Sequence, residues 1–106
     1  MPDLKPAATL GDYQAFVVEL ERERGFDRQR PIEKCLLLGE EVGELFKAVR
    51  KAEGLAIDEA SKVGRLGEEM ADILVMLCSI ANRYGVDLEQ AFREKEELNK
   101  TRRWTV

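Results

Sequence analysis

The sequence predicts an all-α fold, a bundle of four helices completed by homo-oligomerisation. Four stretches repeat apolar residues at intervals of three and four, which is the spacing of one helix face. No alternating apolar run bounded by turns suggests a strand. The chain has 106 residues, of which 44% are hydrophobic, enough for one small core. We therefore expect a single domain spanning residues 1–106.

The first helix is expected at residues 10–24. Thr9 is a suitable N-cap, and Asp12 stands three residues later, as in a capping box. Gly25 can adopt the left-handed conformation that ends many helices. Residues 26–30 then form a short loop.

The second and third helices are expected at roughly residues 32–52 and 62–84. Pro31 suits the first position of the second helix. Within the third, residues 70–81 are apolar on nearly every side. Such a helix must be covered all round, and three short helices of one chain can barely do this. A second subunit would complete its burial.

The fourth helix is expected to follow Asp87, an N-cap residue, with Gln90 at the capping-box position. It continues to about Asn99. The connection at residues 53–61 carries only weak structural signals.

Composition excludes several classes of function. Lys and Arg number 17 against 21 Asp and Glu, a formal net charge of −4, which argues against stable nucleic-acid binding. The chain has no His, which excludes an imidazole base, a His-ligated zinc and a Ser-His-Asp triad. A ferritin-like di-iron bundle fails for the same reason, since it requires Glu-x-x-His pairs.

The two cysteines and the lengths of the apolar runs indicate in which cellular compartment the protein is expected. Cys35 and Cys78 are far apart and lie in apolar helical patterns, so we expect buried free thiols in a reducing cytoplasm. We find no signal-peptide core and no uncharged run of the ~20 residues that a bilayer requires. We therefore expect a cytoplasmic protein that does not bind membranes.

Carboxylates form two spaced pairs on the middle helices. Glu41 and Glu44 are three residues apart, as are Glu69 and Asp72, so each pair shares one helix face. If the two helices pack side by side, the four carboxylates converge and repel one another unless a cation neutralises them. Oxygen-rich ligand sets suit hard cations such as Mg²⁺ or Mn²⁺, and the substrate would be a phosphate ester or anhydride.

Asp72 is the strongest single candidate. It is the only charged residue between positions 70 and 81, and burying an aspartate is costly unless it is paired or metal-bound. The alternative is an ion pair with a cation such as Lys34 or Lys47.

These residues carry a resemblance to a known family. Glu40-Glu41-Val42-Gly43-Glu44, followed by Glu69-Met70-Ala71-Asp72, resembles the EExxE…ExxD signature of the MazG-like nucleotide pyrophosphohydrolases. That family belongs to the all-α nucleoside triphosphate pyrophosphatases, which include dCTP pyrophosphatases. The resemblance extends from about Phe16 to Trp104. It implies a single MazG-like domain that cleaves nucleoside triphosphates between the α and β phosphates, giving the monophosphate and pyrophosphate.

The resemblance also implies roles for individual residues. The metal ligands, for Mg²⁺ with Mn²⁺ as a substitute, would be Glu41, Glu44, Glu69 and Asp72. Glu40 and Glu41 are the catalytic candidates: Glu40 would support the metal-binding acids or help to position the attacking water, although a solvated Glu40 is an equal alternative. Lys95 and Asn99 match fourth-helix positions that face the nucleotide in relatives. The active form would be a homodimer or homotetramer.

Two further substrate-binding candidates have open alternatives. Phe26 lies where relatives carry an aromatic residue near the base; it would either stack on the base or pack as a hydrophobic staple. Lys34 would reach a phosphate or remain an ordinary solvated lysine.

Two classes of function follow. The first is an Mg²⁺-dependent nucleoside triphosphate pyrophosphohydrolase that removes unwanted nucleotides from the cellular pool. The second is a non-catalytic helical oligomerisation or nucleotide-sensing module. The complete set of acids favours the enzyme, because a module without catalysis need not retain it.

Overall fold

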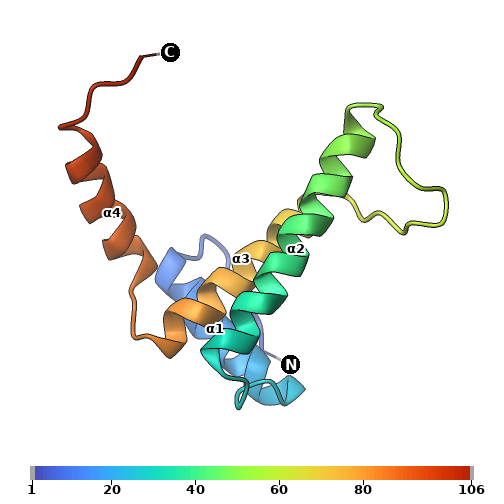
Figure 1. Cartoon of the computed structure of the whole chain (residues 1–106). Coiled ribbons are helices and arrows are strands. Elements are labelled where there is room, and N and C mark those ends of the chain that lie inside the picture. Colours follow the sequence, from blue (N-terminus) through green and yellow to red (C-terminus); the bar gives the residue numbers. More distant parts are fainter. Residues whose placement is uncertain (1, 106) are drawn as a thin grey trace.

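A computed structural model describes residues 2–105 and confirms an all-α fold (Figure 1). Within that range there are four helices and no strand: α1 (Leu10–Arg24), α2 (Pro31–Ala52), α3 (Leu66–Arg83) and α4 (Leu88–Asn99). None of these helices is long and apolar enough for a membrane span.

The predicted helix ends are largely confirmed. The Asp12 N–H donates to Thr9 Oγ1 at 3.1 Å, and the Thr9 N–H donates to Asp12 Oδ2 at 2.8 Å, which completes the capping box of α1. Gly25 ends α1 with a φ of 78°. Asp87 caps α4, but the capping-box role of Gln90 is wrong. Its side chain instead donates to Glu94 Oε1 at 2.9 Å, one turn further along the helix.

The third helix begins later than the sequence pattern predicts. It starts at Leu66 rather than near residue 62, and Arg65 is its N-cap in an extended conformation. The glycine at position 64 disfavours continuation of the helix toward its N-terminus. The connection between α2 and α3 is consequently longer than expected and spans residues 53–65.

Helices α2 and α3 form the main packed pair, and α1 packs against α3 (Figure 1). Small and medium-sized side chains fill the contact between these three helices. The buried apolar residues are Val17, Leu20, Ala48, Cys78 and Ala81. Cys78 is a buried free thiol as predicted, whereas the prediction for Cys35 is wrong, because its side of α2 faces out of the chain.

Helix α4 does not complete a bundle within one chain. Among the other helices it packs appreciably only against α1, and it extends away from the α2–α3 pair (Figure 1). Buried Gln14 fixes the start of α4: its side-chain amide donates to the Val86 carbonyl at 2.8 Å, and its oxygen accepts from the Leu88 N–H at 2.9 Å. The predicted four-helix bundle is therefore a three-helix body with a fourth helix attached at one end.

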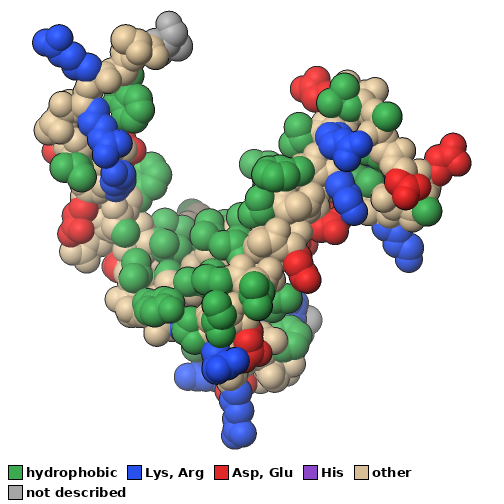
Figure 2. Space-filling model, in the orientation of Figure 1, with side chains coloured by type: hydrophobic (Ala, Val, Ile, Leu, Met, Phe, Trp, Pro, Cys, Tyr) green, Lys and Arg blue, Asp and Glu red, His purple; other side chains and the backbone are tan. Residues whose placement is uncertain are grey.

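Large apolar side chains remain exposed along three helices. The third helix, which we expected to be covered all round, has one open side within the single chain. Figure 2 shows hydrophobic side chains gathered on the body between α4 and the far end of α2. Exposed residues of this kind include Ile32, Leu36 and Phe46 of α2, Met70, Leu74 and Leu77 of α3, and Phe92 and Leu98 of α4.

Candidate metal centre

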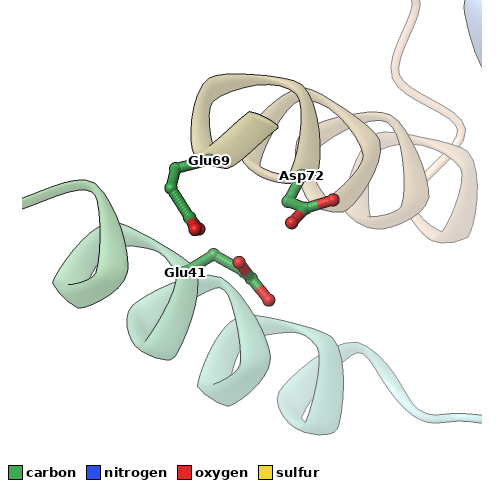
Figure 3. A group of neighbouring side chains, drawn as sticks. All are labelled: Glu41, Glu69 and Asp72. Carbon is green, nitrogen blue, oxygen red and sulfur yellow. The ribbon is translucent and has the colours of Figure 1, made fainter. Parts of the chain in front are cut away.

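Three carboxylates face one another between α2 and α3 (Figure 3). Glu41 comes from the middle of α2, while Glu69 and Asp72 come from the first half of α3. One oxygen from each residue lies within 4.8 Å of the other two. The spacing of three residues places Glu69 and Asp72 on one side of α3, and the α2–α3 contact brings that side to Glu41.

The electrostatics of this group disfavour ionisation. Burial raises the pKa of Glu41, and the charges of Asp72, Glu69, Glu44 and Glu40 raise it further. Burial likewise raises the pKa of Glu69, with Asp72, Glu44 and Glu68 adding to the effect. Glu69 is 9% exposed and Glu41 is half-buried, so neither carboxylate is fully screened by water.

No cationic side chain among the described residues 2–105 forms a salt bridge with these three acids. The alternative of an ion pair for Asp72 is therefore not realised within that range. Lys34 pairs with Glu21 instead. The expectation that Asp72 is buried is wrong, because the apolar run around it is itself partly exposed in the single chain.

The donor set fits a hard divalent cation. Three carboxylates supply only oxygen ligands, which Mg²⁺ and Mn²⁺ prefer over nitrogen or sulfur. The charges are close together, partly shielded from water and without a neutralising side chain. A cation bound among them would relieve their repulsion.

The other two predicted acids lie at the edge of this group. Glu44 is half-buried and close enough to raise the pKa of both Glu41 and Glu69, but it is not one of the three converging residues. Glu40 is exposed and has the smallest effect of the neighbouring acids on Glu41.

Lys34 lies elsewhere, in a buried ionic network. It is 2% exposed, and its Nζ lies 3.1 Å from Glu21 Oε2. Arg83 Nη1 lies 2.9 Å from Glu21 Oε1, and the Ser79 hydroxyl donates to Glu21 Oε2 at 3.0 Å. Burial opposes ionisation of Glu21, but the hydrogen bonds from Arg83, Lys34 and Ser79 outweigh it and lower the pKa.

The same network holds the loop that carries Phe26. Arg83 Nη2 donates to the Phe26 carbonyl at 2.9 Å, and Arg83 Nε donates to the Gln29 carbonyl at 2.7 Å. The ammonium group of Lys34 lies 5.2 Å from the centroid of the Phe26 ring, within cation–π range. Phe26 is 44% exposed, and its ring makes this contact with Lys34 while part of the residue stays open to solvent.

The remaining two candidates, Lys95 and Asn99, are on α4. Lys95 is exposed, and Asn99 donates to Glu96 Oε1 at 3.1 Å. Because α4 extends away from the α2–α3 pair, the structure does not bring these two residues to the acidic group within one chain.

Sequence reasoning missed Glu21 and Arg83 as organising residues. A signal for Glu21 was present: it follows buried Val17 by four residues and buried Leu20 by one, which places it on the inner face of α1. Ser79 and Arg83 are likewise four residues apart and share a face of α3.

The fold and the site together define a class of protein: an all-α protein in which acidic side chains of two adjacent helices face one another. The family model for the MazG nucleotide pyrophosphohydrolase domain matches residues 29–104. The chain therefore belongs to the MazG nucleotide pyrophosphohydrolase family.

Two relatives carry names that refer to deoxynucleotides. The chain is 31% identical to a dATP/dGTP diphosphohydrolase of Cyanophage S-2L, over 92% of this chain and 79% of that protein. It is 33% identical to dCTP pyrophosphatase 1 of Rattus norvegicus, over 92% of this chain and 60% of that protein.

Two solved structures share the fold. A Cyanophage S-2L MazG-like pyrophosphohydrolase, bound to dGDP and three catalytic Mn²⁺ ions per active site, superposes with a TM-score of 0.70 at 29% identity, covering 95% of this chain and 87% of that one. The iMazG protein from Vibrio DAT 722 gives a TM-score of 0.65 at 31% identity, covering 89% of this chain and 100% of the other.

Proposed function

We propose that this protein is an Mg²⁺-dependent pyrophosphohydrolase that converts a nucleoside triphosphate and water into the nucleoside monophosphate and pyrophosphate. The observation that carries the proposal is the convergence of Glu41, Glu69 and Asp72, which form no salt bridge with a Lys or Arg among residues 2–105. Such a site is suited to a cation and a polyanionic substrate, whose charges offset one another.

The comparisons support both the substrate class and the metal. Relatives named as a dATP/dGTP diphosphohydrolase and a dCTP pyrophosphatase are 31% and 33% identical to this chain over the aligned residues. The related Cyanophage S-2L structure holds dGDP and three catalytic Mn²⁺ ions. Mg²⁺ and Mn²⁺ use the same oxygen ligands, so we propose Mg²⁺ as the ordinary ion and Mn²⁺ as a substitute.

The chain's own acids would have separate tasks. A divalent cation bound there supplies charge neutralisation at the phosphates and lowers the pKa of water. Glu41, Glu69 and Asp72 would hold the ion, with Glu44 beside them. Glu40 and Glu41 would orient the attacking water and accept its proton as oxygen bonds to the α phosphorus. The bond from that phosphorus to the bridging oxygen breaks, and pyrophosphate leaves with the electron pair.

Substrate binding would involve the loop after α1. Phe26 is 44% exposed, so its ring could stack on a base, and Arg83 fixes the backbone that presents it. Lys34 supports the ring from the side of the protein and is paired with Glu21. Contact between Lys34 and a phosphate, and contacts of the nucleotide with Lys95 and Asn99, stay predictions.

The active form would be a homodimer or homotetramer. The apolar faces of α2, α3 and α4 that are open in one chain support a second copy as the covering surface. Sedimentation at micromolar concentration tests this. We expect a species of at least twice the chain mass of 12.1 kDa, and a monomer alone would contradict the proposal.

Product analysis tests the reaction. The protein is incubated with Mg²⁺ and ribo-, deoxyribo- and oxidised triphosphates, and monophosphate, diphosphate, pyrophosphate and phosphate are separated. We expect monophosphate and pyrophosphate in equal amounts. Asp72→Asn, which keeps the size and removes the charge, should lower turnover on the order of 100-fold or more with unchanged helix content.

The alternative function, a nucleotide-sensing module, gives a different result. It predicts nucleotide binding that EDTA abolishes, with no turnover of any triphosphate. Diphosphate and phosphate as the products would also contradict α–β cleavage. Full activity in Asp72→Asn would contradict the assignment of Asp72 to the metal.

A further inference from the structure

Gly64 lies directly against the carboxylate of Glu69. It stands in the connection before α3, two residues ahead of Leu66, and a Cβ atom built there would overlap Glu69 Oε1. The same Cβ would lie 3.2 Å from Glu69 Cδ, which is also tight. Glu69 therefore occupies space that exists only because residue 64 has no side chain.

Backbone conformation does not explain this glycine. Three glycines have a positive φ, at positions 25, 54 and 85, and Gly64 is not among them. The φ of Gly64 lies outside the left-handed region that favours glycine, so the requirement that we assign to position 64 is one of space. That space is taken by one of the three acids that converge between α2 and α3.

We infer that Gly64 is a positioning residue for the metal centre, because it leaves the space that allows the Glu69 carboxylate to meet Glu41 and Asp72. The inference rests on the proposed function, since it assigns Gly64 to the site where the divalent cation would bind. Gly64 contributes no ligand atom in this role. It acts only through Glu69.

The consequence of adding a methyl group is specific. The atoms in its way belong to the end of a flexible side chain, so the carboxylate moves while the backbone stays in place. Glu68 Oε2 would lie 3.7 Å from the new Cβ, an ordinary contact, and is not displaced. Gly64→Ala should therefore move Glu69 away from its two partners without unfolding the protein.

Gly67 provides the matched control. It lies three residues further along, and a Cβ there would meet nothing within 4 Å. Gly67→Ala makes the same chemical change close to the site, in the first turn of α3, without touching Glu69. Any difference between the two variants thus reports the space beside Glu69.

The first experiment measures Mn²⁺ binding by electron paramagnetic resonance, without nucleotide. We expect Gly64→Ala to weaken binding by roughly 10-fold, the effect typical of a lost residue that orients a metal ligand. Gly67→Ala should bind Mn²⁺ like the unmodified protein, and both variants should keep its helical circular dichroism. In turnover assays, Gly64→Ala should need more Mn²⁺ for half-maximal rate and recover most of its rate at saturation.

A double-mutant cycle tests whether Gly64 acts through Glu69. In a Glu69→Gln background, Gly64→Ala should cause little further loss of Mn²⁺ affinity, because the ligand charge is already absent. An equal loss in both backgrounds would overturn the inference, as would identical binding by Gly64→Ala and Gly67→Ala. In either case a wild-type protein that still releases pyrophosphate leaves the proposed function intact. A wild-type protein that neither binds Mn²⁺ nor releases pyrophosphate would overturn the function and, with it, the inference.

Discussion

Helix α3 contributes to two groups of charged side chains that contrast sharply. In its first half, Glu69 and Asp72 face Glu41 of α2. In its second half, Ser79 and Arg83 face Glu21 of α1, the partner that Lys34 also contacts. Both groups contain a buried glutamate, Glu69 in one and Glu21 in the other.

The pKa shifts of the two groups have opposite signs. The pKa of Glu21 is lowered, because its hydrogen bonds to Arg83, Lys34 and Ser79 outweigh its burial. The pKa values of Glu41 and Glu69 are raised, because burial and neighbouring acids act in the same direction. The Glu21 network thus contains its own counter-charges, whereas no Lys or Arg among residues 2–105 forms a salt bridge with the three converging acids. Two glutamates that are both buried therefore differ in whether nearby side chains compensate their charge, a difference that burial alone does not reveal.

The largest expected effect on the free energy of unfolding comes from breaking the ionic network around Glu21. Glu21→Gln keeps the shape of the side chain but leaves Lys34 and Arg83 without their counter-charge. Lys34 is only 2% exposed, and removing one partner of a buried ion pair costs about 3–5 kcal/mol. Urea denaturation should show this loss as a lower midpoint with an unchanged slope.

Glu19→Gln is the matched control for this change. Glu19 forms a salt bridge with Arg22 on the same helix, but both side chains are exposed, at 59% and 64%. Such surface pairs contribute about 0–1 kcal/mol. If Glu21→Gln and Glu19→Gln had equal effects on the free energy of unfolding, the structural role of the network would be refuted.

Sequence periodicity predicted the helices because local rules govern them. Thr9, Gly25 and Asp87 act as caps through their own side chains or backbone, so their positions alone located the ends of α1 and the start of α4. The start of α3 was misplaced because the side chain of its N-cap residue, Arg65, makes no capping hydrogen bond, so no capping motif marked the boundary. The extended position of α4 depends on long-range contacts such as those of Gln14, which periodicity does not encode.

The acidic site was predictable to the extent that it depends on helical spacing. The interval between Glu69 and Asp72 placed both on one face, and the structure brings that face to Glu41. The expectation that Asp72 is buried was wrong. Its exposure depends on how the helices pack against one another, which residue spacing within one helix does not reveal. The space beside Gly64 depends on a side-chain conformation, which a residue pattern does not reveal.

The smallest expected effect comes from relieving the repulsion in the acidic group. In EDTA at pH 7–8, Glu41→Gln should stabilise the protein by roughly 0.5 kcal/mol, the size of a like-charge pair on neighbouring helical positions. Glu40→Gln, which removes the weakest contributor to the pKa of Glu41, should have a smaller effect. Thermal unfolding of the two variants beside the wild type measures both changes.

The stabilisation expected from Glu41→Gln should depend on pH, in a direction that follows from the pKa of Glu41. The pKa of Glu41 in the folded protein is raised above its ordinary value of 4.5, so the folded state favours the protonated form. In the wild type, the contribution of Glu41 to the free energy of unfolding is therefore fully present below pH 4.5. It is lost as the pH rises from 4.5 through the pKa of Glu41 in the folded protein. The advantage of Glu41→Gln should disappear below that range. Glu21 titrates in the opposite sense: its lowered pKa means that its contribution is lost as pH falls. A gain from Glu41→Gln that persisted at low pH would show that repulsion among the acids is not its cause.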